Sequence, residues 1–238
     1  MSKTISIDGK PVEFVEGQTI MEAAAAAGVY IPHLCHHPDF TPHGSCKLCT
    51  VKVNGRNCSA CTFPAAEGQE VLNETDELRE ERRMITQMLF VEGNHFCPSC
   101  EKSGNCQLQA VTYYLDMLDD HFPLFFANRE VDASHPEVMI DHNRCIFCTL
   151  CVRASHLDGK DVFAISGRGI NKHLIVNSPS GKLRDSDLEA TDRAVDICPT
   201  GAILRKGEGF QVPIGQRIFD REKIDQVSLA EEGGSHDG

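Results

Sequence analysis

Tryptophan is absent from this chain, and aromatic residues make up only 6% of its 238 residues. So few aromatic side chains leave little bulk for one large core, and several small modules are expected instead. Basic residues are also scarce, with 23 lysines and arginines against 35 acidic residues and a net charge of −12. This balance disfavours a nucleic-acid-binding protein, because such proteins neutralise phosphates with basic side chains.

Long apolar segments are missing as well. No apolar run reaches the roughly eighteen residues that identify a membrane-spanning helix. The opening residues MSKTISIDGK contain no apolar core of a secretory signal peptide. We therefore expect a cytoplasmic protein without a membrane span, in a compartment that keeps thiols reduced.

The motifs of several active sites are also absent. The sequence has no Walker loop, no G-x-G-x-x-G dinucleotide motif, no flavin-site signature and none of the paired cysteine motifs of a nickel–iron centre. Gly167 and Gly169 open no predicted helix, so they indicate a hairpin turn. No catalytic residue is predicted, and a complete active site is expected only on partner subunits.

Cysteine is abundant, with twelve residues that fall into groups. Three C-x-x-C pairs recur among them: Cys46/Cys49, Cys97/Cys100 and Cys148/Cys151. Thiols at this interval on a loop can converge on one ion or cluster, whereas a disulfide scaffold belongs to small secreted domains. Structural zinc sites use the same pairs and remain an alternative, as a zinc-stabilised scaffold module. Several iron–sulfur clusters, and hence electron transfer, are the favoured interpretation.

Residues 1–78 have the pattern of a β-grasp domain. Asp8-Gly9 and Asn54-Gly55 are two-residue turn signals between alternating segments, so each predicts a hairpin. Thr19 and Glu22 form a capping box in front of an alanine run. The expected elements are strands over 4–7 and 12–15, a helix from 19 to 28, and strands over 50–53 and 71–72.

One loop of this domain carries Cys35, Cys46 and Cys49. The two small residues before Cys46 would let backbone N–H groups approach the sulfurs and tune a cluster. Cys58 and Cys61 compete for the fourth ligand position. Alternation in a strand places residues 59 and 61 on one face and residue 58 on the other. A [2Fe-2S] cluster fits this site best.

Residues 79–120 are expected to form a small helical module. A loop with the spacing C-x2-C-x5-C lies between amphipathic helices predicted over 76–92 and from residue 108 onward. It holds three candidate ligands of a [4Fe-4S] cluster: Cys97, Cys100 and Cys106. His95 is the nearest candidate for the fourth ligand, and a surface histidine without a role is the alternative.

Residues 121–205 contain the most specific motif. Cys145, Cys148 and Cys151 repeat the C-x2-C-x2-C of bacterial ferredoxins, but the next position of that run is Ser155. The closing Cys-Pro is supplied instead by Cys198 and the proline that follows it. One [4Fe-4S] cluster is predicted here. Strands over 162–165 and 173–176 and a helix over 185–197 are expected around it.

The tail of residues 206–238 contains no cysteine but several apolar residues. We expect residues 207–230 to lie across a partner subunit, with folding back on the third module as the alternative. The final residues EEGGSHDG are expected to be disordered.

The order of the three modules resembles two related families over nearly the whole chain. One comprises the start of the large iron–sulfur subunit of NADH dehydrogenase, and the other the small diaphorase subunit of soluble NAD-reducing nickel–iron hydrogenases. The segments EGNHFCPSCEKSGNCQLQAV and DHNRCIFCTLCVR, and an end at residue 238, look like the second family. The resemblance implies an α+β protein with one [2Fe-2S] and two [4Fe-4S] clusters.

The resemblance also implies a full ligand set and partners. It places the fourth ligand of the first cluster at Cys61, and it implies His(Cys)3 ligation of the middle cluster through His95. In the commoner family version three residues separate that histidine from the first cysteine, whereas here only Phe96 does. The implied partners are an FMN-containing NAD(H)-binding diaphorase subunit and the small and large hydrogenase subunits. A gamma-type electron-transfer subunit of an NAD-linked formate dehydrogenase is the second interpretation.

Overall fold

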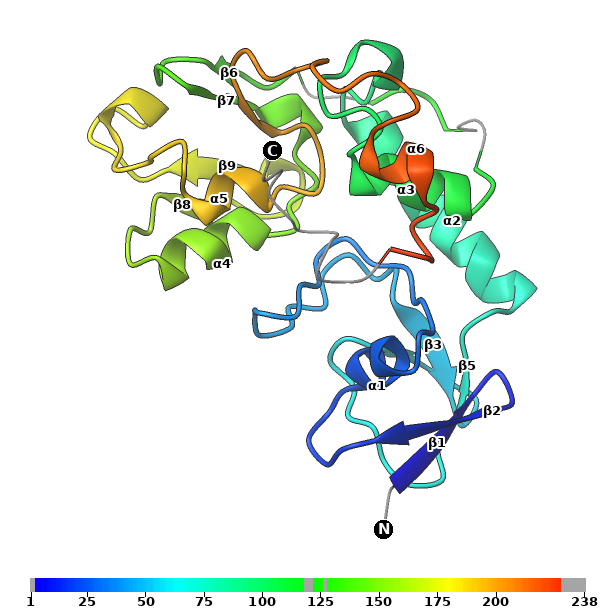
Figure 1. Cartoon of the computed structure of the whole chain (residues 1–238). Helices are drawn as coiled ribbons and strands as arrows, with labels where there is room; N and C mark the ends of the chain where they lie inside the picture. The colour runs from blue at the N-terminus through cyan, green and yellow to red at the C-terminus, as the bar shows by residue number, and fades with distance from the viewer. Residues whose placement is uncertain (1–2, 118–121, 126–127, 228–238) are drawn as a thin grey trace.

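The computed structural model describes residues 3–117, 122–125 and 128–227. It shows an α+β protein in which an N-terminal sheet, a helical middle region and a second, smaller set of strands follow one another along the chain (Figure 1). The expected α+β class is thereby confirmed. All twelve cysteines are free thiols, so the structure contains none of the disulfides of the secreted-scaffold alternative.

The N-terminal region is a five-stranded sheet of order β2-β1-β5-β3-β4, in which β1 and β5 run parallel. Both predicted hairpins are confirmed, and Asp8 and Gly9 have the left-handed φ values, 49° and 78°, of a tight hairpin turn. The capping box of Thr19 and Glu22 also forms. The elements are β1 (Lys3–Ile7), β2 (Lys10–Phe14), α1 (Ile20–Ala26), β3 (Thr50–Val53), β4 (Arg56–Ser59) and β5 (Glu70–Leu72).

The middle region is built on two helices, α2 (Asp76–Glu92) and α3 (Gln107–Tyr114). Thr75 caps α2, because its hydroxyl accepts a hydrogen bond from the backbone N–H of Leu78. Arg82 is fully buried and donates to carbonyls of the N-terminal region, at 3.0 Å to both Leu48 and Thr50. These bonds fix α2 against the sheet, because a buried guanidinium must keep its acceptors.

The third region carries a sheet of order β10-β7-β6 and a separate β8–β9 hairpin. The hairpin confirms the two strands expected on either side of residues 167–169, although its connection also contains the short η3 (Gly169–Asn171). The other elements are β6 (Val131–Asp132), β7 (Val138–Asp141), η2 (His142–Arg144), α4 (Leu150–Leu157), β8 (Phe163–Ser166), β9 (His173–Val176), η4 (Leu183–Asp185), α5 (Arg193–Asp196) and β10 (Ile203–Arg205).

The helix expected over residues 185–197 was a wrong prediction for most of its length, because only α5 is α-helical there. Polar side chains capture backbone groups in front of it. The Ser186 hydroxyl donates to the carbonyl of Leu183, and the Asp192 carboxylate accepts from the N–H of Glu189. Such local bonds compete with helix formation.

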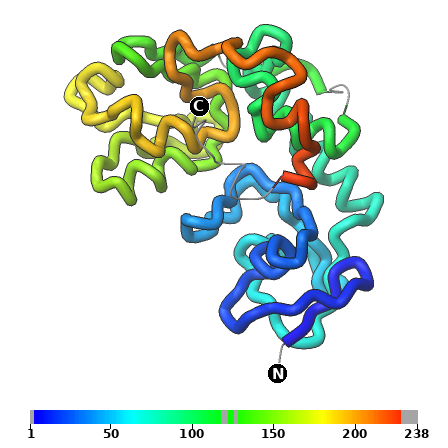
Figure 2. Tube along the Cα trace, viewed as in Figure 1, coloured from blue at the N-terminus to red at the C-terminus, as the bar shows by residue number. Residues whose placement is uncertain are grey.

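The tail crosses from the third region to the middle region and ends in α6 (Ile218–Arg221) beside α3 (Figures 1 and 2). The Phe219 N–H donates to the carbonyl of Gly104, and the Ile218 N–H donates to the side chain of Asn105. Ile224 joins the buried cluster around α3. The segment from Ile218 to Ile224 thus packs on the middle region. The expected disorder of EEGGSHDG lies outside the described residues.

None of the helices in the described ranges is long and apolar enough to cross a membrane.

Candidate cluster-binding sites

The first cysteine set lies on the loop that rises from α1 toward the third region and on the turn after β4 (Figure 1). The Cys49 and Cys61 sulfurs are 3.3 Å apart, and the Cys46 N–H points at the Cys35 sulfur at 3.4 Å. Three of the four thiols, Cys35, Cys49 and Cys61, are buried. The structure therefore brings together the four cysteines that the sequence predicted for this site.

Cys58 takes a different position. It lies on β4, paired in register with Val51, and its partly buried side chain packs against the core of the sheet. That core also contains Cys49 and Cys61, so the structure does not separate Cys58 from the candidate ligands, and its exclusion as a ligand stays a prediction.

Hydrogen bonds inside the first set already favour negative charge on some of its sulfurs. Hydrogen bonds from Cys46 lower the pKa of Cys35 to about 4, and burial opposes them only in part. Ser45 adds its hydroxyl and its backbone N–H to the Cys35 sulfur, as expected for a small residue in front of Cys46. The Cys49 thiol likewise lowers the pKa of Cys61. In a thiolate-bound cluster the Cys46 and Cys49 thiols lose their protons, and the backbone N–H groups of Ser45 and Cys46 and the Ser45 hydroxyl remain as donors that offset its charge.

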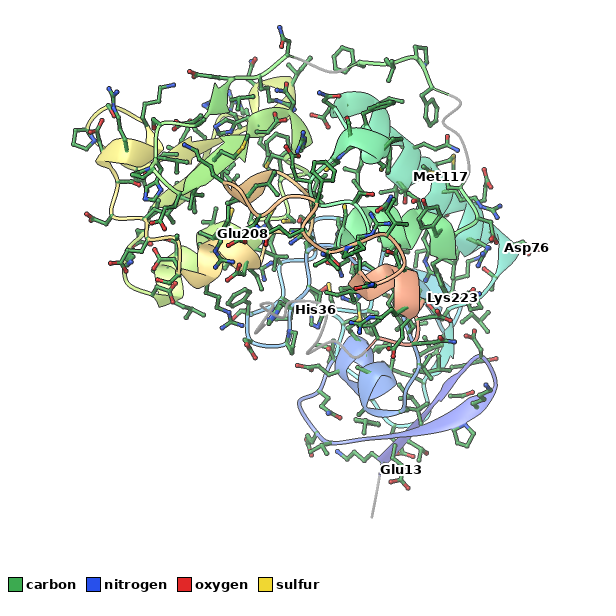
Figure 3. All side chains as sticks on the ribbon, turned by 45° about the horizontal axis from the view of Figure 1, so that its top comes forward. Glu13, His36, Asp76, Met117, Glu208 and Lys223 are labelled. Atoms are coloured by element: carbon green, nitrogen blue, oxygen red, sulfur yellow. The ribbon has the colours of Figure 1, made fainter. Side chains whose placement is uncertain are left out.

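His36, next to Cys35, is 5% exposed, and neither of its ring nitrogens has a hydrogen-bond partner within the described chain. Burial, followed by the neighbouring His33, lowers its pKa to about 4. The ring lies where the N-terminal region meets the rest of the chain (Figure 3). Its unpartnered nitrogens are polar groups in a place where a sulfide-bearing cluster would offer acceptors.

The middle set is more open. Cys97 and Cys100 are partly exposed at the two sides of the short η1 (Cys97–Ser99), whereas Cys106 is buried in front of α3. Burial raises the pKa of Cys106 to about 12, so cluster binding there must release a proton. The Cys100 sulfur lies against Gly201 of the third region, where an added Cβ would come within 2.9 Å of it.

His95 folds back over the end of α2. Its ring is 5.4 Å from the ring of Phe90, and a Cβ on Gly93 would meet its Nε2 at 2.4 Å. Gly93 has a φ of −105°, so space for this ring, and not a left-handed conformation, requires a glycine there. Burial, followed by the charge of Arg144, lowers the pKa of His95 to about 4, which keeps the imidazole neutral as a metal ligand must be.

The third set surrounds a single small cavity. All four predicted cysteines line it, and the other lining residues are uncharged: Ile146, Phe147, Thr149, Ile165, Leu174, Pro199, Thr200, Ala202 and Ile203. Phe147 and Thr149 have left-handed φ values of 55° and 64° on either side of Cys148. Strained backbone of this kind clusters at functional sites, where it aims backbone groups at a ligand.

The donors around this cavity fit a cluster. The Thr149 hydroxyl is buried and has no hydrogen-bond partner in the part of the chain that the structure describes. A cluster in the cavity would supply an acceptor for it. Burial raises the pKa of Cys145 to about 12 and raises those of Cys148 and Cys151 well above the usual value of a thiol, so these three thiols bind iron only on losing protons.

Two arginines that sequence reasoning missed lie between the sites. Arg144 precedes Cys145 and pairs with Glu101 and Asp141, at 2.7 and 3.1 Å. Arg153, on α4, donates to the carbonyls of Cys35 and Cys148. Nothing in the local spacing marked either residue, because the partners that link each of them to another site, Glu101 and Cys35, are distant in sequence.

The chain matches three family profiles. Residues 2–76 match the 2Fe-2S iron-sulfur cluster binding domain, residues 82–121 match the NADH-ubiquinone oxidoreductase-G iron-sulfur binding region, and residues 138–204 match the 4Fe-4S single cluster domain. The three matches follow the order of the three cysteine sets.

Similar proteins extend these matches over the whole chain. The gamma subunit of the NAD-reducing hydrogenase HoxS of Cupriavidus necator is 41% identical over 226 residues, which cover 94% of this chain and 96% of that subunit. A chain in a crystal structure of an NAD+-reducing [NiFe]-hydrogenase in the H2-reduced state is 50% identical, with a TM-score of 0.94 over 98% of this chain and 99% of that one. The alpha subunit of an NADPH-Fe(3+) oxidoreductase of Geobacter sulfurreducens is 30% identical over 87% of this chain but only 24% of its own length.

Proposed function

The chain belongs to the family of the gamma subunits of NAD-reducing hydrogenases, and on this premise we propose that it relays electrons between an FMN- and NAD(H)-binding diaphorase subunit and a nickel–iron hydrogenase module. The complex would couple H2 oxidation to the reduction of NAD+. The chain is an iron–sulfur electron-transfer subunit, and the catalytic sites of the complex lie on other subunits. The observation that carries this proposal is the 41% identity over 96% of the Cupriavidus subunit.

We assign one cluster to each cysteine set. A [2Fe-2S] cluster would bind Cys35, Cys46, Cys49 and Cys61; one [4Fe-4S] cluster His95, Cys97, Cys100 and Cys106; and a second Cys145, Cys148, Cys151 and Cys198. The close sulfurs of the first set and the shared cavity of the third support their assignments. When bound, the clusters supply one-electron carriers.

The corresponding domains would be 1–78, 79–120 and 121–205. The sheet order β2-β1-β5-β3-β4, with a parallel β1–β5 pair and a single helix between the hairpins, supports a β-grasp fold for the first. For the tail, we propose a partner-docking role only for residues 207–216, because residues 217–227 pack on the chain itself. Phe210 and Ile214 in that stretch are 64% and 85% exposed.

Metal analysis tests the proposal. The complex purified through this chain should contain nickel, together with a flavin and NADH-dependent dye reduction. Molybdenum or tungsten in place of nickel would favour a formate dehydrogenase. The full chain alone should be brown and hold about ten irons, two from the first cluster and four from each of the others. A colourless chain loaded with zinc would reject the electron-transfer role.

A further inference from the structure

Arg153 joins the loops of the first and third sites. It projects from α4, next to the third cysteine set, and its guanidinium donates to the carbonyl of Cys35 at 2.5 Å and to that of Thr41 at 3.0 Å. A longer bond of 3.4 Å reaches the carbonyl of Cys148. The rigid fork of an arginine can hold several acceptors at once, which a lysine cannot do in the same geometry. Two of these acceptors belong to proposed cluster ligands from different sites.

A second arginine, Arg193, also contacts the first-site loop, but it does not reach the carbonyls beside the cysteines. Phe40, on the first-site loop, is buried in the core of the third region. Its ring lies 5.4 Å from the Arg153 guanidinium and 4.8 Å from that of Arg193. Arg193 pairs with Asp39 on the same loop. Arg153 and Arg193 thus hold the same ring, but only Arg153 reaches the carbonyls beside the cysteines.

The charge of Arg153 is not neutralised by a carboxylate of the described residues, since its hydrogen bonds go to carbonyls alone. Arg144, at the boundary between the middle and third sites, contrasts with it through ion pairs to Glu101 and Asp141. The thiols that interact electrostatically with Arg153 come from both sites: Cys148, Cys35, Cys151 and Cys61. An uncompensated cation therefore lies between two groups of thiols.

We propose that Arg153 is a positioning residue that holds the first-site loop against the third site and whose charge raises the reduction potentials of the clusters in both. This inference rests on the cluster assignments of the proposed function. A cluster gains negative charge when it is reduced, and a nearby cation stabilises that state. A partly buried cation acts more strongly than one in water, because the local dielectric is lower.

The test is a redox titration of the full, cluster-loaded chain, followed by EPR. In Arg153→Gln, which removes the charge, we expect the potentials of the [2Fe-2S] and the third-site [4Fe-4S] cluster to shift to more negative values. In Arg153→Lys, which keeps the charge but loses the fork, both potentials should stay near those of the wild type while the melting temperature falls. The matched control is Arg193→Gln, which removes the other cation over Phe40 and should leave both potentials unchanged.

The outcomes separate this inference from the proposed function. A wild-type chain that binds no iron would overturn both. Wild-type potentials in an iron-loaded Arg153→Gln chain, or an equal shift in Arg193→Gln, would overturn the role of Arg153 alone. Should Arg153→Gln fail to hold its clusters, Arg153→Lys decides the question, since potentials well below wild type in that variant would contradict control by charge.

Discussion

The middle and third sites each combine three thiols close together in sequence with one further candidate ligand, His95 or Cys198, yet the structure builds them differently. The third set surrounds one cavity with uncharged walls, and its remote thiol, Cys198, lines the same cavity. In the middle set Cys97 and Cys100 are partly exposed, and the His95 ring packs between Phe90 and Gly93. The third site is thus enclosed by residues of its own region, whereas two thiols of the middle site stay partly exposed.

The middle site also contacts the third region. The Gln107 N–H, which follows Cys106, donates to the carbonyl of Pro199 at 2.9 Å, and the Cys106 sulfur lies 3.6 Å from the same oxygen. Gly201 faces the Cys100 sulfur. The segment from Cys198 to Gly201, which borders the third site, therefore also forms one wall of the middle site. A substitution in one site is therefore expected to affect the cluster of the other site to a different degree, and the loss of each cluster can be measured separately.

Replacing Cys198 by serine should have the largest effect. The variant removes a sulfur from the cavity of the third site and leaves a poorer iron ligand in its place. We expect loss of the third-site [4Fe-4S] cluster, so that the full chain retains about six irons, and loss of electron transfer between hydrogenase and NAD+ in the complex. Iron analysis and EPR of the reduced chain would measure this. A variant with a full iron content would show that Cys198 is not the closing ligand.

Two substitutions at His95, by cysteine and by alanine, should affect the middle cluster alone. Because an imidazole is neutral and a thiolate anionic, His95→Cys should lower the potential of the middle cluster, as the reverse exchange raises it in Rieske centres. His95→Ala should change the spectrum or the occupancy of that cluster while the other two stay intact. Unaltered EPR signals in both variants would mean that another residue is the fourth ligand.

Gly201→Ala should have a smaller effect, and it should disturb the middle site while leaving the third site intact. The new Cβ would lie 2.9 Å from the Cys100 sulfur, and overpacking of this kind costs about 1–3 kcal/mol of folding free energy. We expect a lower melting temperature and a disturbed middle cluster, with the third cluster retained. Loss of the third cluster instead would show that Gly201 mainly supports the third site. That result would contradict its role as a wall of the middle site.

The sequence predicted local structure where local rules suffice. Turn residues placed both N-terminal hairpins, a capping box placed α1, an amphipathic pattern placed α2, and the cysteine intervals identified the three sets. The helix expected over 185–197 shortened to α5 because Ser186 and Asp192 bind nearby backbone groups. The contacts of Gly201 with Cys100 and of Arg153 with Cys35 were not predictable, since folding alone brings these partners close.

Cys58→Ser should have the smallest effect, and it tests how the first site chooses among its five cysteines. Cys58 lies on β4 opposite Val51 and packs against the buried cluster that contains Cys49 and Cys61, whose own sulfurs form a close pair. We expect all three clusters to persist and a stability change of about 1 kcal/mol or less, since the exchange is nearly isosteric at a partly buried position. The matched variant Cys61→Ser should lose the [2Fe-2S] EPR signal. The opposite pattern would exchange the roles of the two cysteines, and it would show that strand alternation is a poor guide to ligands at the end of a strand.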